Sequence, residues 1–335
     1  MALSIRHDHL HGFDFNLVST ELSQCSPGKV QVEYIFPERV KLCYPHLDIQ
    51  FSAYLMIMNN HLDKFLNLKE PKVIDAKERT NFLCSFNRNK HNCRVQFLLN
   101  LFAEGFYSPE FCSKHFTISD EEWLEFVRNA PDEIKNKFSL SSTFDFLKSE
   151  SRHHGQTTSK FVGQNFTDLI ELSPLMQKSF ITAVSETVAA SYVPFPTEKI
   201  CFPIATKSLW IAYAQPGYYK HIEQYMGFKP PLGIDYSFDS VEDPTQRLQA
   251  LMIELKRLSQ FDDQQKIDIY GLNRDIFDYN FALLTSGEMI ANLWSYDECQ
   301  EHYQDFTNLS TISNFTHLSL INQWTATMKF FAKKK

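Results

Sequence analysis

The sequence predicts an α/β fold with a parallel sheet at its centre, on three observations. Apolar runs of strand length lie at 81–86, 180–184 and 209–214, and a helical pattern follows each of them. Polar residues follow the second and third runs directly, as Ser185-Glu186 and Gln215-Pro216-Gly217-Tyr218. Because the carboxyl ends of parallel strands meet at one edge of a sheet, two such turns are expected to bring ligand-type side chains together there.

Residues 1–78 predict a small N-terminal domain that contains strands. Residues 30–36 alternate between apolar and polar side chains as a strand does, and residues 51–58 form a second apolar segment. Four prolines separate the short apolar runs of this region, namely Pro27, Pro37, Pro45 and Pro71. Short strands separated by turns are the structure that this pattern favours.

A second, larger domain is predicted for residues 79–285. It begins with the strand at 81–86, followed by a polar, basic loop and a helix from Arg94 that ends near Gly105. A strand, a loop and a helix in this order make half of a βαβ unit. Residues 107–165 are polar and irregular, which predicts an insertion within this domain.

Regular α/β order is expected to resume at Asp168. Residues 149–167 are rich in Ser, His, Gly, Gln and Thr, and this composition predicts a mobile segment that borders the site. Asp243 then caps an amphipathic helix, and another helix is predicted for residues 264–285. Residues 286–335 are predicted to form a helical C-terminal segment that packs back on the N-terminal domain.

Composition and charge narrow the classes of partner. The net charge is −7 and the pI about 5.9, so no overall field attracts nucleic acid, although a local basic groove is compatible with both values. The seven cysteines are scattered singly and form no CxxC pair. This distribution argues against zinc ribbons and thioredoxin-like sites, and it favours a reduced compartment.

No targeting, membrane or metal-binding segment is predicted. The charged N-terminus lacks the apolar core of a signal peptide, so we expect a soluble protein that is cytoplasmic or delivered without a Sec signal peptide. No apolar run approaches the roughly eighteen residues of a membrane span.

The His7-Asp8-His9-Leu10-His11 run has no distant ligand to complete a metal site, and GxSxG, Walker and GxGxxG motifs do not occur. We therefore expect that no cofactor is required, with a divalent metal left open.

Glu198 and Lys199 are the residues whose chemistry points most directly to a ligand. They follow Thr197, which is expected to cap a short helix. A carboxylate accepts hydrogen bonds from the two hydroxyls of a ribose, whereas cations and helix N-termini bind a pyrophosphate. The alternative interpretation is an ordinary helix start, but a lysine in the first turn opposes the helix dipole and favours the ligand. The local chemistry therefore suits a sugar nucleotide.

A longer run around these residues resembles a known motif. The chain reads Phe195-Pro196-Thr197-Glu198-Lys199-Ile200-Cys201-Phe202-Pro203-Ile204, preceded by Ser185-Glu186 at a strand end. This run resembles the nucleotide-sugar motif of the α1,3-fucosyltransferase family and of related uncharacterised viral and bacterial glycosyltransferases of the GT-B type. The resemblance covers roughly residues 80–285. It implies a Rossmann-like nucleotide-sugar-binding domain and a smaller N-terminal, acceptor-side domain that faces it across a cleft.

The resemblance also implies roles for individual residues. Glu198 would hold the donor ribose, Lys199 and Arg94 would neutralise the pyrophosphate, Arg88 competes with Arg94 for that role, and Glu186 would lie on the donor side of the cleft. The full set of expected donor-binding residues is Arg88, Arg94, Ser185, Glu186, Thr197, Glu198, Lys199, Gly217 and Tyr218. The general base of the family is an acidic residue of the N-terminal domain, and the candidates here are Glu33, Glu38 and Asp48, none of which is marked by a motif.

The function expected from the resemblance is transfer of a sugar from a nucleotide-diphosphate sugar to an acceptor hydroxyl, without a required metal. GDP-fucose is the first donor to consider, and the acceptor is a carbohydrate, a protein or a nucleic acid. Two alternatives stay open. The first is a GT-B-like binding protein without activity, which the unmarked base, the short N-terminal domain and the insertion favour. The second is a glycosyltransferase that modifies DNA, against which the net charge of −7 counts.

Overall fold

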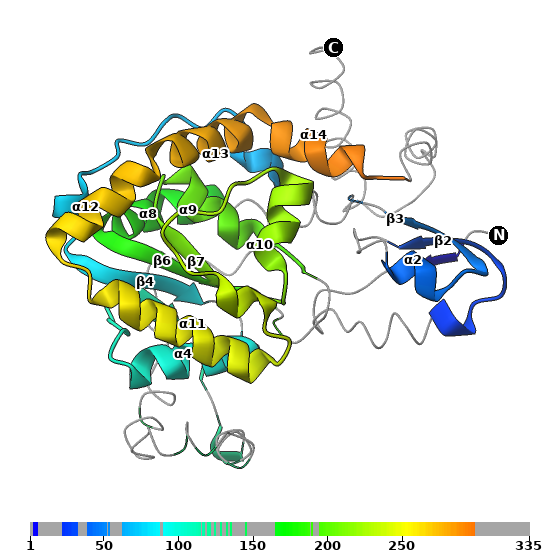
Figure 1. Ribbon diagram of the computed structural model, residues 1–335, viewed down its shortest axis with the longest axis horizontal. Coiled ribbons are helices and arrows are strands. Elements are labelled where there is room, and N and C mark those ends of the chain that lie inside the picture. The colour runs from blue at the N-terminus through cyan, green and yellow to red at the C-terminus, as the bar shows by residue number, and fades with distance from the viewer. Residues whose placement is uncertain are drawn as a thin grey trace.

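The computed structural model describes most of the chain between residues 22 and 298. The described residues are 3–5, 22–32, 39–51, 53, 62–87, 90–114, 116, 117, 119–121, 124, 128, 132, 135, 145, 165–187, 189 and 194–298. They form an α/β structure with two separate sheets, in both of which all paired strands are parallel (Figure 1). The predicted α/β class with parallel strands is thereby confirmed.

The N-terminal sheet has three strands in the order β1-β2-β3. Their bounds are β1 (Leu3–Ile5), β2 (Gly28–Val32) and β3 (Leu47–Phe51). In β3 the side chains of Leu47, Ile49 and Phe51 are buried and that of Asp48 is exposed, because successive side chains of a strand point to opposite faces. The short helix α2 (Arg39–Cys43) packs against β3.

The larger sheet has four strands in the order β5-β4-β6-β7. Their bounds are β4 (Asn81–Asn87), β5 (Cys112–Lys114), β6 (Ser179–Ser185) and β7 (Trp210–Tyr213). Leu83 pairs with Ile181, and Ala183 with Ile211, so the three predicted strands of this region lie next to one another in the order β4-β6-β7. β6 and β7 are buried along their whole length, as expected of strands covered on both faces, and their continuous apolar runs follow from that burial.

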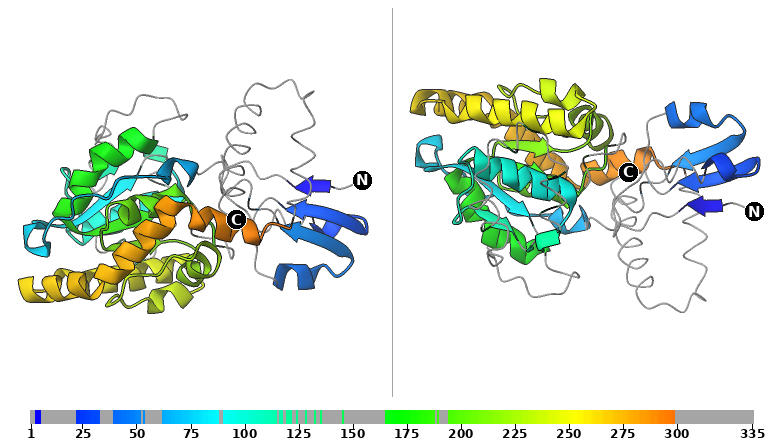
Figure 2. Two further views of the ribbon diagram at one scale, coloured as in Figure 1. Left: turned by 90° about the horizontal axis from the view of Figure 1, so that it is seen from above. Right: turned by 90° about the horizontal axis from the view of Figure 1, so that it is seen from below.

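Helices cover both faces of the larger sheet (Figures 1 and 2). Their bounds are α4 (Asn92–Ala103), α8 (Asn165–Lys178), α9 (Cys201–Ala205), α10 (Tyr218–His221), α11 (Pro244–Ser259), α12 (Asp263–Leu272), α13 (Arg274–Ser286) and α14 (Glu288–Ser295). The chain leaves β4 through α4 toward β5, then returns through α8 and α9 to β6 and β7. Because right-handed crossovers in opposite directions lie on opposite faces, α4 packs with α11, whereas α9 packs with α8 and α13.

Two predicted helices differ in their extent from the observed ones. The single helix predicted at 264–285 is divided into α12 and α13 at Asn273. The buried Asn273 amide accepts from the Leu232 N–H (2.7 Å) and donates to the Leu232 carbonyl (2.9 Å), so a contact distant in sequence fixes the break. The helix predicted from Arg94 begins at Asn92 and ends before Gly105, which has the positive φ of 74° typical of a residue that follows a helix.

The residues after α14 connect the helices around the larger sheet to the N-terminal sheet. The Asp297 carboxylate accepts from the Ala53 N–H (2.8 Å), and Glu298 accepts from the Phe51 N–H (2.9 Å) and from Lys41. The Glu298 N–H also donates to the Phe51 carbonyl (2.9 Å). This segment therefore lies along β3. The predicted packing of residues 286–335 concerns mainly residues 299–335, which lie outside the described part, as does almost all of the segment 149–167.

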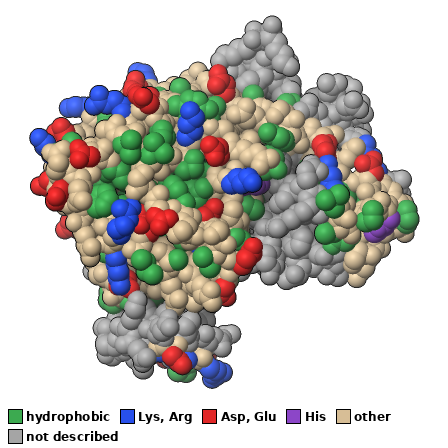
Figure 3. Space-filling model, in the orientation of Figure 1, with side chains coloured by type: hydrophobic (Ala, Val, Ile, Leu, Met, Phe, Trp, Pro, Cys, Tyr) green, Lys and Arg blue, Asp and Glu red, His purple; other side chains and the backbone are tan. Residues whose placement is uncertain are grey.

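The surface of the larger part of the molecule carries charges of both signs. On the face seen in Figure 3, Lys and Arg side chains are interspersed with Asp and Glu, and hydrophobic side chains lie between them. Exposed apolar residues of the described chain include Leu232, Ile253 and Leu272. None of the described helices is both long and apolar enough to cross a membrane.

Candidate functional site

The site lies at the point in the larger sheet where the order of strand addition reverses: β5 is added on one side of β4, and β6 and β7 on the other. β5 lies on one side of β4 and β6 on the other, so the carboxyl ends of β4 and β6 mark the topological switch point. The N-terminus of α4 and the residues after β6 meet there. Arg94 Nη2 donates to Thr187 Oγ1 (2.9 Å), and Cys93 Sγ donates to the Thr187 carbonyl (3.2 Å). Open α/β sheets bind ligands at this point.

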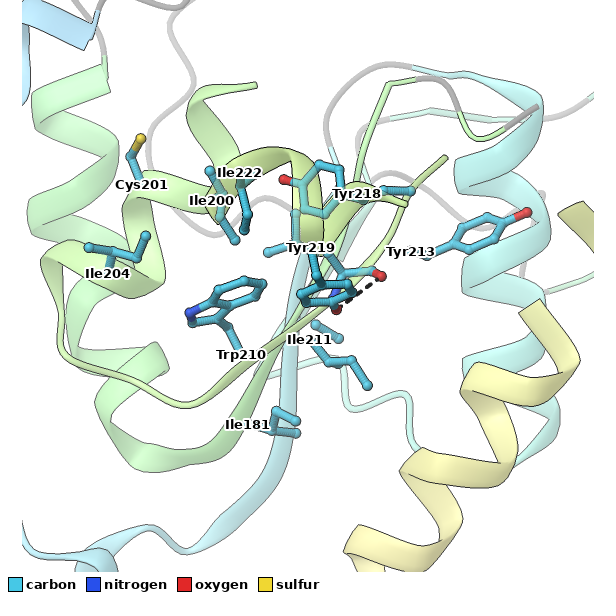
Figure 4. Close-up of a cluster of buried hydrophobic side chains, with 14 of the residues drawn as sticks. Ile181, Ile200, Cys201, Ile204, Trp210, Ile211, Tyr213, Tyr218, Tyr219 and Ile222 are labelled. Carbon is cyan, nitrogen blue, oxygen red and sulfur yellow. Dashed lines mark hydrogen bonds between the residues drawn. The ribbon is translucent and has the colours of Figure 1, made fainter. Parts of the chain in front are cut away.

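Packed aromatic rings hold the turn after β7 in place (Figure 4). The rings of Trp210 and Tyr219 stack with centroids 5.5 Å apart, and the Tyr219 hydroxyl accepts from the Ala212 N–H (2.6 Å). Gly217 (φ +75°) turns the chain from β7 into α10, and the Asp239 carboxylate binds the Tyr218 N–H (3.0 Å). Burial raises the pKa of Asp239 to about 6 against the opposing effect of such hydrogen bonds. These contacts position the Tyr218 side chain at the switch point.

A buried carboxylate connects the three loops of the site. Glu186, directly after β6, is fully buried. Its Oε1 accepts from the Thr197 N–H (3.0 Å) and from the Tyr218 hydroxyl (2.7 Å), and its Oε2 accepts from the Thr197 hydroxyl. The sequence placed Glu186, Thr197 and Tyr218 among the residues that contact the donor. All three are buried, and Thr197 and Tyr218 both donate to Glu186, so the three residues fix the positions of the loops.

The expected capping role of Thr197 is wrong in one respect. Thr197 does occupy the N-cap position of the short 3-10 helix η4 (Glu198–Ile200), but its side chain makes no capping hydrogen bond. The hydroxyl binds Glu186 instead, because a buried carboxylate needs hydrogen-bond donors more than a three-residue helix needs a cap. This contact crosses eleven residues of sequence, which no local pattern encodes.

Glu198 and Lys199 form the partly exposed part of the site, and the buried Arg94 side chain lies near them. Lys199 Nζ donates to Thr197 Oγ1 (2.9 Å) and to Glu198 Oε1 (3.3 Å), and the side chains of Lys199 and Glu198 are 21 % and 27 % exposed. Burial raises the pKa of Glu198, but the nearby charges of Lys199 and Arg94 lower it by more, so the net shift of the pKa is downward. Burial lowers the pKa of Arg94, which the nearby carboxylates of Glu186 and Glu198 partly offset. Glu198 is therefore ionised at neutral pH.

His91 is a site residue that the sequence did not reveal. It is the N-cap residue of α4, and its side chain does not cap the helix. Burial, then Arg94, then Lys199 lower its pKa to about 4. Burial has the largest effect, and the further lowering by Arg94 and Lys199 indicates a positive potential at this helix N-terminus. Its position directly before the helix is the only sequence signal that could have found it.

The remaining predicted site residues divide into three groups. Ser185 is buried, with its hydroxyl 3.5 Å from the Glu186 carbonyl, and Gly217 shapes the backbone, its N–H donating to the Asp239 carbonyl (2.9 Å). Asp48 is exposed on β3, in the other sheet from the switch point. Arg88, Glu33 and Glu38 lie outside the described residues.

Among the described residues, no three His, Cys, Asp or Glu side chains gather closely enough to hold a metal ion. Comparisons of the chain with protein-family models, with curated proteins and with solved structures found no match.

Proposed function

We propose that the protein is a glycosyltransferase that binds a nucleotide-diphosphate sugar at the switch point. One observation carries the proposal: Arg94 from α4 and Glu198 and Lys199 from η4 come together beside the N-terminus of α4. These residues come from segments about a hundred positions apart in the sequence, so their meeting is a property of the fold. A carboxylate, two cations and a helix N-terminus suit a ribose attached to a pyrophosphate.

The chemistry of transfer assigns each group a task. A deprotonated acceptor hydroxyl attacks the anomeric carbon while the bond from that carbon to the diphosphate oxygen breaks. Arg94, Lys199 and the first N–H groups of α4 stabilise the negative charge that the diphosphate gains as it leaves. Glu198, ionised between the cations, accepts hydrogen bonds from the ribose hydroxyls. The reaction so described needs no metal ion.

The acceptor side of the proposal rests on the N-terminal sheet. A GT-B enzyme has two α/β domains with the reaction between them, and the parallel strands β1 to β3 are compatible with the second of these. An acidic residue of this region would take the proton from the acceptor hydroxyl. Asp48, Glu33 and Glu38 are the candidates, and replacing each with alanine while measuring transfer separates them.

The donor site is tested by calorimetry with a panel of GDP-, UDP- and ADP-sugars. Lys199→Ala should weaken donor binding or turnover by about 10²-fold or more, because one charge-stabilising contact is lost. Arg94→Ala should do the same, and Arg94→Lys keeps the charge should the buried alanine variant fold poorly. Lys220→Ala is the matched control, since Lys220 is exposed on α10. Binding without any transfer or donor hydrolysis would instead indicate a binding protein, and unchanged affinity in both alanine variants would remove these residues from the site.

The charge distribution does not favour DNA as the acceptor. Acidic and basic side chains are mixed on the face seen in Figure 3, and the net charge is −7. Neutralisation of several phosphates needs a concentrated array of Lys and Arg. We therefore propose a carbohydrate or protein acceptor.

A further inference from the structure

Lys199 is linked through Thr197 to the Glu186 carboxylate. Its ammonium donates to Thr197 Oγ1 (2.9 Å), and the Thr197 hydroxyl in turn donates to Glu186 Oε2. Glu186 is fully buried and Thr197 nearly so, whereas Lys199 is partly exposed. A chain of two hydrogen bonds thus leads from a buried carboxylate to a partly exposed cation.

The donor and acceptor directions along this chain are fixed by chemistry. An ionised carboxylate only accepts hydrogen bonds and an ammonium only donates them. The Thr197 hydroxyl must therefore give its hydrogen to Glu186 and offer a lone pair to Lys199. Glu198 (3.3 Å) accepts a second N–H of the ammonium. Because an ammonium carries three N–H bonds, one has no acceptor among the described residues and can meet a ligand oxygen.

We propose that Glu186 and Thr197 are positioning residues for Lys199: they hold its ammonium in one orientation before a ligand arrives. The proposal rests on the proposed function only in naming that ligand as the donor diphosphate. Long lysine side chains lose rotamer entropy when they bind, and a side chain that is already held loses less. The buried pair therefore raises affinity without contacting the ligand.

The geometry of Glu186 offers a control within the same carboxylate. Tyr218 donates to Oε1 (2.7 Å), whereas the Thr197 hydroxyl donates to Oε2. Tyr218→Phe removes a hydroxyl from the buried cluster but leaves the chain to Lys199 intact. Thr197→Val removes the connecting hydroxyl at nearly constant volume, and Thr197→Ser keeps it.

The first experiment needs no ligand. Lysines are acetylated with limiting acetic anhydride, and mass spectrometry measures the acetylation rate of Lys199. The exposed Lys220 is the internal reference. Thr197→Val and Glu186→Gln should raise the Lys199 rate roughly tenfold, the factor expected when a hydrogen bond to a charged group is lost. Tyr218→Phe and Thr197→Ser should stay near the wild-type rate. Equal rates in all variants, or an equal rise in Tyr218→Phe, would overturn the proposal.

The second experiment measures inorganic pyrophosphate binding by calorimetry in a double-mutant cycle. Thr197→Val should weaken binding in the wild-type background and have no further effect in Lys199→Ala, because it acts through that lysine. A loss that persists in Lys199→Ala would contradict the positioning role. If neither pyrophosphate nor any nucleotide sugar binds, but the labelling rates change as expected, the positioning of Lys199 stands and the proposed function falls.

Discussion

The charged residues of the switch point differ in their exposure to solvent, and this difference decides what each can do. Glu186 is fully buried and meets its hydrogen-bonding needs inside the protein, so it organises the loops. Lys199 and Glu198 are partly exposed and can meet a ligand. The sequence placed both Glu186 and Glu198 on the donor side, and nothing local in it shows that one carboxylate is buried and the other partly exposed.

The pKa of His91 should report on anion binding. Burial, Arg94 and Lys199 hold it at about 4 in the free protein. A bound diphosphate neutralises the two cations, so the pKa should rise toward its ordinary value near 6.5. Binding then takes up a proton, and donor affinity should increase as the pH falls through the raised pKa and level off below about 4.

A titration by NMR measures the His91 pKa with and without a nucleotide sugar, whose bridging diphosphate keeps its charge over this range. His221 is the internal control, because burial alone lowers its pKa to about 3. An unchanged His91 pKa at saturating donor would place the diphosphate elsewhere.

At the scale of the elements, the loops after β6 and β7 are fixed by contacts between them. The Glu186 backbone N–H continues the pairing of β6 with β7 by donating to the Tyr213 carbonyl (3.0 Å). The N-terminus of α10 is held by the Asp239 carboxylate. The turn between β7 and α10 depends on Gly217, whose φ of +75° is costly for other residues.

Gly217→Ala should destabilise the protein by about 1–2 kcal/mol, because alanine in this left-handed conformation is strained. A Cβ at this position meets no atom within 4 Å, so the strain comes from the backbone alone. Gly271→Ala is the matched control: Gly271 lies in α12 with equally open space, and alanine there should stabilise by roughly 0.5–1 kcal/mol. Chemical denaturation measures both values. A Gly217→Ala variant as stable as wild type would show that the turn does not need glycine.

Elements were predictable where their signal is local. β4, β6 and β7 are apolar runs bounded by polar residues, and α11 begins at an Asp-Pro pair, where Asp243 caps it by accepting from the Gln246 N–H (2.8 Å). The break at Asn273 and the burial of Glu186 were not predictable, because their partners lie 41 and 32 residues away. The convergence of Arg94 with Lys199 was expected only through the family resemblance.

At the scale of the whole molecule, two parallel sheets are connected by the segment after α14. Asp297 and Glu298 bind the backbone at Ala53 and Phe51, so the end of the described chain returns to the N-terminal sheet. The proposed donor-binding residues that the structure describes all belong to the larger sheet and its loops, so donor binding there does not require a particular arrangement of the two sheets.

Hydrogen exchange with each nucleotide sugar of the panel tests the central claim most directly, because it locates the ligand on the intact protein. A donor bound at the switch point should protect two segments together: the start of α4 around Arg94, and the Thr197 to Lys199 turn. The amino-terminal edge of the same sheet, around Arg79 and Ser179, should exchange at its ligand-free rate. Protection of only one segment, protection at the opposite edge, or no protection by any sugar nucleotide at saturating concentration would contradict the account.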